Sequence, residues 1–463
     1  MSHKKTFLIV IAVLFAQPIL LFSSSGEIQL PEEFQVQNCT AVLATADATL
    51  DGSVLFAKNN DLSEFDLSWL YYSPRERYSA GSRVKLQDVE IPQVSTTWAW
   101  IGSKGPTWWG MGMGINEWGL ATGINDAPTR EEAEKGIRSD ELCRLVLERA
   151  KNPADAVQLI GDLVTTYGFS GDEFGHGKVY PLANSTEAWI VEITPRHWVA
   201  AKVEGIKIIA NQFQITDHWD LGSEDLVEYA IEQGWCKSRE EFNFARCYSA
   251  EGYPFLSSQT RIERGLELLE PKLGKICPED LMEVMRDHYE NTELYWYPPH
   301  KNPSYRTICV SRTSASMVCH LKPWMPRQLQ LIWFSVCPPC GSVFVPIYTG
   351  ATEIFKPWRS GIGGEDWTNY TSDSAWWRFK RLQYLVEKNY EVYQPLVLEK
   401  WEKIYQTELG QSQKFEKKIE KMLRSGKANQ AKVEINKFVN KNLEEAYEEA
   451  NLIFKELASP AKS

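Results

Sequence analysis

Apolar residues near the N-terminus form one continuous run, whereas most later apolar residues alternate with polar ones in short blocks. The run over residues 7–22 follows two lysines and precedes residues 23–26, which are small. This pattern is typical of a secretory signal peptide, here over residues 1–25. A membrane anchor is the alternative, but the run is shorter than the ~20 residues of a membrane span and is interrupted by Gln17-Pro18. We therefore expect a secreted or extracytoplasmic protein, with residues 26–38 as a short polar propeptide.

The first blocks after the leader predict a hairpin. Residues 40–49 and 53–58 are β-rich runs on either side of Asp51-Gly52, a strong hairpin signal. A two-residue loop there would pair Val42 with Asp61. Asp61 would then return to within about 10 Å of Cys39, at ~3.4 Å per residue.

Later blocks predict a mixed core of sheets and helices followed by a helical region. Residues 139–150, with Ser139 as N-cap, and residues 154–163 have helical periodicity. Strands are predicted at three further runs, which are 187–192, 198–203 and 206–210. From Trp376 onward Lys, Glu, Gln and Leu dominate, which predicts long helices over 376–463 and a core domain over 39–375. We expect these helices to pack as an appendage; a partner-binding coiled coil is the alternative.

Composition narrows the choice of partners. The chain has 463 residues and a net charge of −11, which argues against nucleic acid or an anionic membrane surface as partner. No later segment is long and apolar enough to span a bilayer, so no span is expected once the signal is removed. Self-association into a homo-oligomer stays open. The 18 tryptophans favour an aromatic core and cleft wall over a sugar-binding surface.

The sequence has nine cysteines, so an even number of eight remains if Cys39 has another role. In an oxidising compartment these eight can form disulfides; buried free thiols are the alternative. Cys337-Pro-Pro-Cys340 has the spacing of a metal or redox motif, but zinc would need a second matching pair and none follows. We therefore predict no metal site. Asn184 and Asn369 begin glycosylation sequons.

Cys39 is the leading candidate for a nucleophile. Cleavage before it would free an α-amine with a pKa of roughly 7.7–8.0, which can take the thiol proton near neutral pH. Nucleophile and base would then reside in one residue, as in N-terminal-nucleophile hydrolases. An early cysteine in a secreted protein can instead be half of a disulfide.

Several blocks in order resemble one family of such hydrolases. Cys39-Thr40, Asp51-Gly52-Ser53 and residues 56–61 resemble the opening of the dipeptidase A/secernin family. Residues 109–120, of sequence WGMGMGINEWGL, are similar to that family's Gly-x-Asn-Glu-x-Gly-Val block. Shorter matches are residues 187–192, 209–215, 286–288 and 306–308. The resemblance covers roughly residues 39–408.

The resemblance implies an α+β protein with a four-layer αββα core and hydrolysis of amide bonds, typically in dipeptides. It implies no metal and no organic cofactor. Cys39 would attack the scissile carbonyl, and Asp61 would contact its freed amine. Lys58 stands where distant relatives have arginine, and a cation there would favour the thiolate. Asn211 would donate its side-chain amide to the oxyanion.

Four further residues are candidates on weaker matches. Asn125 resembles the asparagine of a Gly-Asn-Glu-Ala block with one residue inserted, so its register or role stays open. Arg261 resembles a late active-site arginine, with an exposed helix arginine as the alternative. Asp126 and Glu117 are candidates for contact with a substrate ammonium group. Arg286-Asp287-His288 is not expected to act as a triad, because an N-terminal cysteine has its own base.

These inferences converge on an exported cysteine-type dipeptidase, matured autocatalytically between Asn38 and Cys39, that acts on a small peptide or amide substrate. The first alternative is an acyl-amide hydrolase of N-acylated small molecules. The second is a non-catalytic, secernin-like binding or secretion protein.

Overall fold

A computed structural model describes residues 39–132, 135–172 and 176–459 of the chain. The predicted signal peptide and propeptide lie outside these residues. Within them, no helix combines the length and the apolar character needed to cross a bilayer.

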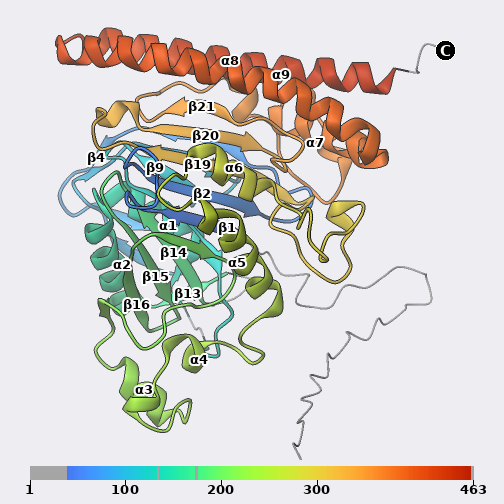
Figure 1. Ribbon diagram of the computed structural model, residues 1–463. Coiled ribbons are helices and arrows are strands. Elements are labelled where there is room, and N and C mark those ends of the chain that lie inside the picture. Colours follow the sequence, from blue (N-terminus) through green and yellow to red (C-terminus); the bar gives the residue numbers. More distant parts are fainter. Residues whose placement is uncertain (1–38, 133–134, 173–175, 460–463) are drawn as a thin grey trace, which may run out of the picture.

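Two antiparallel sheets lie face to face at the centre of the molecule (Figure 1). The six-stranded sheet has the order β17 (Ile206–Ile209), β1 (Thr40–Ala44), β2 (Val54–Asp61), β19 (Thr313–Leu321), β20 (Leu331–Val336) and β21 (Val345–Tyr348). The nine-stranded sheet has the order β18 (Leu221–Gly222), β16 (Trp198–Val203), β15 (Ala188–Ile193), β14 (Lys178–Ala183), β10 (Ala121–Gly123), β9 (Met113–Asn116), β8 (Trp100–Lys104) and β3 (Trp69–Ser73), with β11 (Asn125–Asp126) also paired to β14. Apolar residues of both inner faces, such as Val42 and Met113, belong to one buried core.

Helices cover the outer face of each sheet. Helices α5 (Leu256–Leu269) and α6 (Pro278–Arg286) pack on the six-stranded sheet. Helices α1 (Ser139–Arg149) and α2 (Pro153–Tyr167) pack on the nine-stranded sheet. Because β1 and β2 are covered on both faces, every one of their residues is buried. The predicted four-layer αββα core is confirmed.

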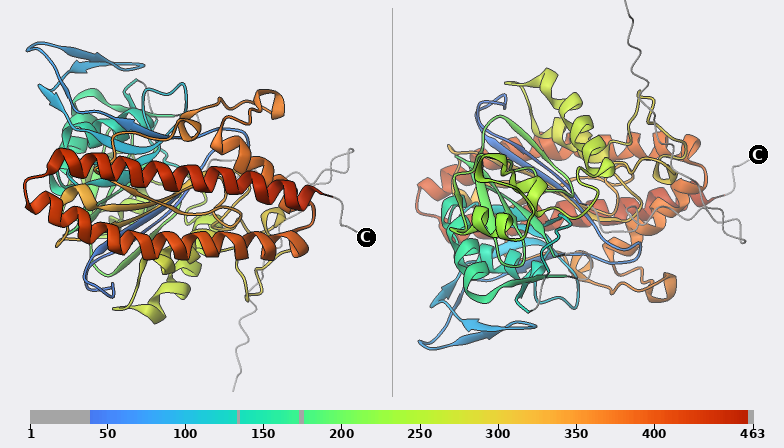
Figure 2. Two further views of the ribbon diagram at one scale, coloured as in Figure 1. Left: turned by 90° about the horizontal axis from the view of Figure 1, so that it is seen from above. Right: turned by 90° about the horizontal axis from the view of Figure 1, so that it is seen from below.

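The predicted helical region consists of α7 (Ala375–Lys388), α8 (Tyr390–Arg424) and α9 (Ala428–Ala458). Figure 2 shows α8 and α9 as two long helices side by side. They pack on β21, and α7 packs on β20. Trp377 and Trp401 are buried in the same core as the sheet residues, so this region completes the helical layer over that sheet.

The remaining strands and α-helices are short. They are β4 (Glu76–Arg77), β5 (Arg83–Lys85), β6 (Glu90–Pro92), β7 (Thr96–Thr97), β12 (Ile137–Arg138), β13 (Phe169–Gly171), α3 (Leu226–Glu232) and α4 (Phe244–Tyr248).

The β1–β2 register differs from the predicted one. Asp51-Gly52 does form a turn, with Gly52 at a φ of 76°. However, β1 ends at Ala44, and residues 45–53 connect the strands, so Val42 pairs with Ala57 rather than with Asp61. The prediction assumed a two-residue loop and was therefore wrong by four positions. Thr40 pairs with Asn59, which brings Asp61 closer to Cys39 than predicted.

The start of α1 also differs from its prediction. Ser139 is the first residue of the helix, and Arg138 occupies the N-cap position. The Ser139 hydroxyl donates to Asp172 at 2.5 Å and is therefore not available for capping.

Candidate active site

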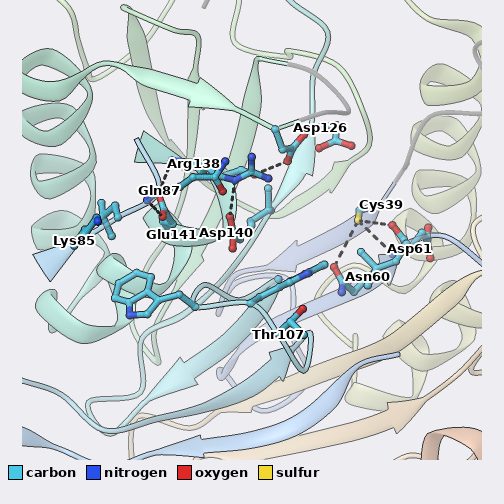
Figure 3. Close-up of a pocket in the computed structure, with 18 residues that line it drawn as sticks. Cys39, Asn60, Asp61, Lys85, Gln87, Thr107, Asp126, Arg138, Asp140 and Glu141 are labelled. Atoms are coloured by element: carbon cyan, nitrogen blue, oxygen red, sulfur yellow. Dashed lines mark hydrogen bonds and ion pairs between the residues drawn. The ribbon is translucent and has the colours of Figure 1, made fainter. Parts of the chain in front are cut away.

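Cys39 lies directly before β1, beside the end of β2. The Asp61 backbone N–H donates to the Cys39 Sγ at 3.4 Å. The same Sγ lies 4.0 Å from Asn60 Oδ1 and 3.9 Å from the Asp61 carbonyl oxygen (Figure 3). The strand pairing thus positions the thiol by backbone as well as side-chain contacts.

The thiol faces a cavity of about 510 Å³. This volume is in the range of small-molecule sites. Figure 3 shows Cys39 and Asp61 on one side of the cavity and Arg138 and Glu141 on the other. Carboxylates line much of its wall (Asp126, Asp140, Glu141 and Asp172), together with the aromatic Trp108 and Trp109.

Lys58 is a fully buried cation beneath this thiol. Its Nζ donates to the Asn59 carbonyl at 3.1 Å and to Asn60 Oδ1 at 3.5 Å. Burial raises the pKa of the Cys39 thiol, and the nearby Lys58 opposes that rise. A buried cation here therefore makes the thiolate more accessible than burial alone would allow.

Gly123 leaves the space that the Lys58 side chain occupies. A Cβ on Gly123 would lie 2.4 Å from Lys58 Cδ and 2.9 Å from Cε. Gly112 has the same relation to Asn60, since its Cβ would lie 2.8 Å from Asn60 Oδ1. The glycines of β10 and of the residues before β9 thus let the two sheets close over the polar residues of β2.

Gly123→Ala is expected to displace Lys58 and so raise the pKa of Cys39 further. A rise of one pKa unit means about tenfold less thiolate at neutral pH, and alkylation by iodoacetamide should slow by about that factor. The measurement is the alkylation rate of Cys39 against pH, followed by peptide mass spectrometry. Gly410→Ala, whose Cβ meets nothing within 4 Å, is the control and should leave the rate unchanged. An unchanged rate in Gly123→Ala would contradict the role given to Lys58.

The Asp61 carboxylate is held by two groups from the segment before and at the start of β19. Arg306 Nη2 donates to its Oδ2 at 2.5 Å, and the Thr313 hydroxyl donates to its Oδ1 at 2.6 Å. All three side chains are buried. Arg306 was not among the predicted site residues, although residues 306–308 were among the blocks that carried the resemblance.

Arg261 connects Cys39 to Asn211. Its Nη1 donates to the Cys39 carbonyl at 2.8 Å and to the Thr40 hydroxyl at 2.9 Å, and its Nη2 donates to Asn211 Oδ1 at 2.9 Å. Arg261 is fully buried in α5, so the alternative of an exposed helix arginine is wrong. The Asn211 Nδ2 is buried and has no hydrogen-bond partner among the residues that the structure describes. A buried donor without a partner is costly. Asn211 is not among the described residues that line the cavity around Cys39, and Arg261 connects it to that residue.

Asn125 and Asp126 form β11 and point in different directions. Asn125 Nδ2 donates to the Ile209 carbonyl at 3.3 Å, in the strand paired to β1. Asp126 lines the cavity and forms an ion pair with the buried Lys178 at 2.8 Å. Burial raises the pKa of Asp126 to about 6, against the opposing effect of Lys178.

Comparison with known proteins places this geometry in a family. The sequence profile of peptidase family C69 matches residues 256–403, and that of acyl-coenzyme A:6-aminopenicillanic acid acyl-transferase matches residues 49–318. A probable dipeptidase of Latilactobacillus sakei is 24% identical over 415 residues, covering 78% of this chain and 83% of the relative. A probable dipeptidase of Salmonella dublin is 23% identical over 382 residues, covering 73% and 87%.

The chain belongs to the dipeptidase A/secernin-like family of N-terminal-nucleophile cysteine hydrolases. It is a hydrolase of amide bonds. Among solved structures, the penicillin V acylase of Agrobacterium tumefaciens matches with a TM-score of 0.38 and 14% identity, covering 67% of this chain and 86% of that one. A variant of the conjugated bile acid hydrolase of Clostridium perfringens matches with a TM-score of 0.38 and 12% identity, covering 64% and 89%.

One residue proposed from the family's glycine-rich block lies elsewhere. Glu117 is not among the described residues that line the cavity around Cys39. Its carboxylate instead binds Arg75 at 2.6 Å and accepts the Ala99 backbone N–H at 2.9 Å. Its assignment to a substrate ammonium group is therefore wrong. The Asn-Glu pair of this block is structural: Asn116 Nδ2 donates to the Leu147 carbonyl at the end of α1.

The histidine of residues 286–288 is also absent from the cavity lining among described residues. Asp287 binds Arg264 at 2.8 Å, and His288 binds Glu290 at 2.7 Å, so these residues form no triad with Cys39. The His176 Nδ1 donates to the Ser170 carbonyl oxygen, 2.9 Å away.

All nine cysteines are free thiols in the structure, and all but Cys236 and Cys277 are buried. This agrees with the buried-thiol alternative, and disulfides stay a prediction. Asn184 and Asn369 are partly exposed, and their glycosylation stays a prediction.

Proposed function

We propose that this hydrolase is an exported cysteine-type dipeptidase that cleaves itself between Asn38 and Cys39. The observation that carries the proposal is the Cys39 thiol at a cavity of about 510 Å³ with carboxylates on its wall. A cavity of this size suits a dipeptide, and carboxylates suit its free ammonium group. The names of the two relatives as probable dipeptidases agree with this assignment.

The reaction would use Cys39 for both nucleophilic attack and proton transfer. Its freed α-amine takes the thiol proton as sulfur attacks the peptide carbonyl carbon. Collapse of the tetrahedral intermediate breaks the C–N bond, and the ammonium returns the proton to the leaving amine. Water then attacks the thioester with the same amine as base, which releases the acid and restores the thiol.

Three residues would support these steps without exchanging protons. Asn211 would donate its Nδ2–H to the oxyanion, and Arg261 would hold both Asn211 Oδ1 and the Cys39 carbonyl in place. Asp61, fixed by Arg306 and Thr313, would place a negative charge near the Cys39 amine and favour its protonated form.

Substrate recognition would rest on the acidic wall, with Asp126 as the ammonium contact. Because its pKa is about 6, the Asp126 carboxylate becomes charged as pH rises through about 6. We expect the ratio of kcat/KM for a free dipeptide to that for its N-acetylated form to rise over this range. Groups shared by both reactions cancel in the ratio, and measurement below the α-amine pKa of roughly 7.7–8.0 keeps the substrate charged.

Asp126→Asn should remove the pH dependence of this ratio. It should also raise KM for free dipeptides by about 10–100-fold, because one charged hydrogen bond to the substrate is lost. Lys178 keeps Asp172 at 2.9 Å as an ion-pair partner in this variant. Glu117→Gln is the control and should keep the pH-dependent ratio. A pH-dependent ratio that survives in Asp126→Asn would assign the ammonium contact to another carboxylate.

The substrate class itself is tested with the unmutated enzyme. Equal activity on free and N-acetylated dipeptides would reject the dipeptidase assignment. The alternative is an acyl-amide hydrolase, which the match to the acyl-transferase profile and the apolar lining residues Trp108, Trp109 and Ile124 favour. A non-catalytic secernin-like binding or secretion protein would have no need to expose Cys39 as its N-terminus.

A further inference from the structure

Two histidines and two cysteines from two connections of the chain meet in a cluster that does not line the cavity around Cys39. His288 follows α6, His300 lies in the short helix Pro299–Lys301, Cys309 precedes β19, and Cys340 follows β20. Their ligand atoms all lie within 4.8 Å of one another. The cavity around Cys39 is lined by other residues of the described ranges.

The spacing of these atoms matches a tetrahedral zinc site. The His300 Nε2 lies 3.1 Å from His288 Nε2, 3.8 Å from Cys309 Sγ and 3.5 Å from Cys340 Sγ. Zinc with bonds of about 2.3 Å to sulfur and about 2.0–2.1 Å to nitrogen separates two nitrogens by about 3.3 Å and a nitrogen from a sulfur by about 3.6 Å. The His300 Nε2 is thus close to ligand separation from each of the other three atoms, and all four atoms lie within 4.8 Å of one another.

The Nδ1 atom of each histidine, which faces away from the cluster, lies within hydrogen-bond distance of a carboxylate. His288 Nδ1 lies 2.7 Å from Glu290 Oε1, and His300 Nδ1 lies 2.8 Å from Glu387 Oε1. When each Nδ1–H donates to its carboxylate, a neutral ring turns the Nε2 lone pair toward the centre of the cluster. This carboxylate–histidine arrangement is the one that orients histidine ligands around zinc.

The cluster is buried, so a cation at its centre needs anionic ligands to balance its charge. The side chains of His288 and His300 are only 2% and 3% exposed, and both cysteines are buried. Without an ion, one Nε2–H can donate to the other Nε2 at 3.1 Å; an ion at the centre would replace this contact with a bond to each Nε2. One divalent cation with two thiolates leaves no net charge.

We propose that His288, His300, Cys309 and Cys340 bind one structural zinc ion. Binding releases the two thiol protons and fills all four positions of the tetrahedron, so the ion has no open position for a substrate or water. It would take no part in amide hydrolysis.

The ion would secure the long connection between α6 and β19. Residues 287–312 contain one regular element, the helix Pro299–Lys301, and a connection of this length needs anchoring. The same connection supplies Arg306, which binds Asp61 beside Cys39. Glu387 belongs to α7, so the site would also tie the C-terminal helices to the core.

The segment that carries Cys340 is held by helices on two sides. Arg286 of α6 donates to the Pro339 carbonyl at 2.9 Å, and Gln394 of α8 donates to the Cys340 carbonyl at 2.5 Å. Cys337, the other cysteine of the Cys-Pro-Pro-Cys motif, points elsewhere, since its Sγ contacts the Trp376 carbonyl at 3.4 Å. The motif therefore contributes one ligand to the proposed site, and a search of the sequence for a second pair of the same spacing does not reveal the other three.

The test is the metal content of the full chain, produced with zinc in the medium and measured by inductively coupled plasma mass spectrometry. We expect about one zinc per chain, and less than about a tenth of that in Cys340→Ser and in Cys309→Ser. Cys337→Ser is the matched control and should retain its zinc. Zinc retained in the ligand variants would overturn the proposal.

A second measurement needs no variant and so does not depend on how the variants fold. Unmutated protein grown with cobalt should show visible absorption typical of tetrahedral cobalt and a thiolate-to-cobalt charge-transfer band in the near ultraviolet. Metal-free protein from both preparations, or a Cys309–Cys340 disulfide in the peptide map, would overturn the proposal.

Discussion

Cys39→Ala is expected to lower kcat for dipeptide hydrolysis by at least ~10⁴-fold while leaving the thermal unfolding midpoint nearly unchanged. Loss of a nucleophile removes covalent catalysis altogether, and only binding and oxyanion stabilisation remain. The Cys39 side chain is small and makes weak contacts through Sγ, so the fold does not depend on it. The measurement is steady-state kinetics on free dipeptides together with calorimetry. Cys319→Ala, at a buried cysteine of β19 in the same sheet, is the control and should keep its activity.

The same variant tests maturation. If cleavage between Asn38 and Cys39 is autocatalytic, Cys39→Ala should retain the residues before position 39, and Cys39→Ser should be cut slowly. N-terminal sequencing or mass spectrometry of the purified chains gives the answer. Active protein with Asn38 still attached would contradict the N-terminal-nucleophile mechanism. Clean processing of Cys39→Ala would assign the cut to another protease.

Asn211→Ala is expected to lower kcat by roughly 10²–10³-fold, about 2.7–4 kcal/mol of transition-state stabilisation, with a much smaller change in KM. Its Nδ2 is a buried donor, and Arg261 fixes the amide by binding Oδ1. A donor set in place before the reaction stabilises negative charge that appears only in the transition state. The measurement is kcat and KM determined separately on the same dipeptide.

The neighbouring Gln212 offers a matched control for this prediction. Its amide accepts the Phe255 backbone N–H and faces Gln259, so it is engaged within the protein. Gln212→Ala should change kcat by less than tenfold. A rise in KM with unchanged kcat in Asn211→Ala would instead assign Asn211 to ground-state binding.

Much of this protein was determined by local sequence pattern. The β-rich runs on either side of Asp51-Gly52 predicted β1 and β2, and the helical periodicity of residues 139–163 predicted α1 and α2 to within a few residues. The composition or spacing of apolar residues that favours each of these elements lies within a short stretch of the chain. The hairpin also placed Asp61 near Cys39, and residues 209–215 contained Asn211.

Contacts between distant segments were decided by the tertiary structure. The β1–β2 register depended on where β1 stopped, which the turn at Asp51-Gly52 did not reveal. Glu117 belongs to a block that resembles the family, yet Arg75 holds it away from Cys39. Arg306 reaches Asp61 across 245 positions of the chain.

The cluster of His288, His300, Cys309 and Cys340 is a second example of contacts that the sequence did not predict. Its four members have no repeated spacing: three lie far apart along the connection between α6 and β19, and Cys340 lies in the connection that follows β20. The spacing of residues in a sequence reveals a site only when several of its residues belong to one helix, strand or turn. Local pattern therefore determined the elements and pointed to Cys39 as the candidate nucleophile, whereas packing of the two sheets and their helices decided which charged, histidine and cysteine side chains meet.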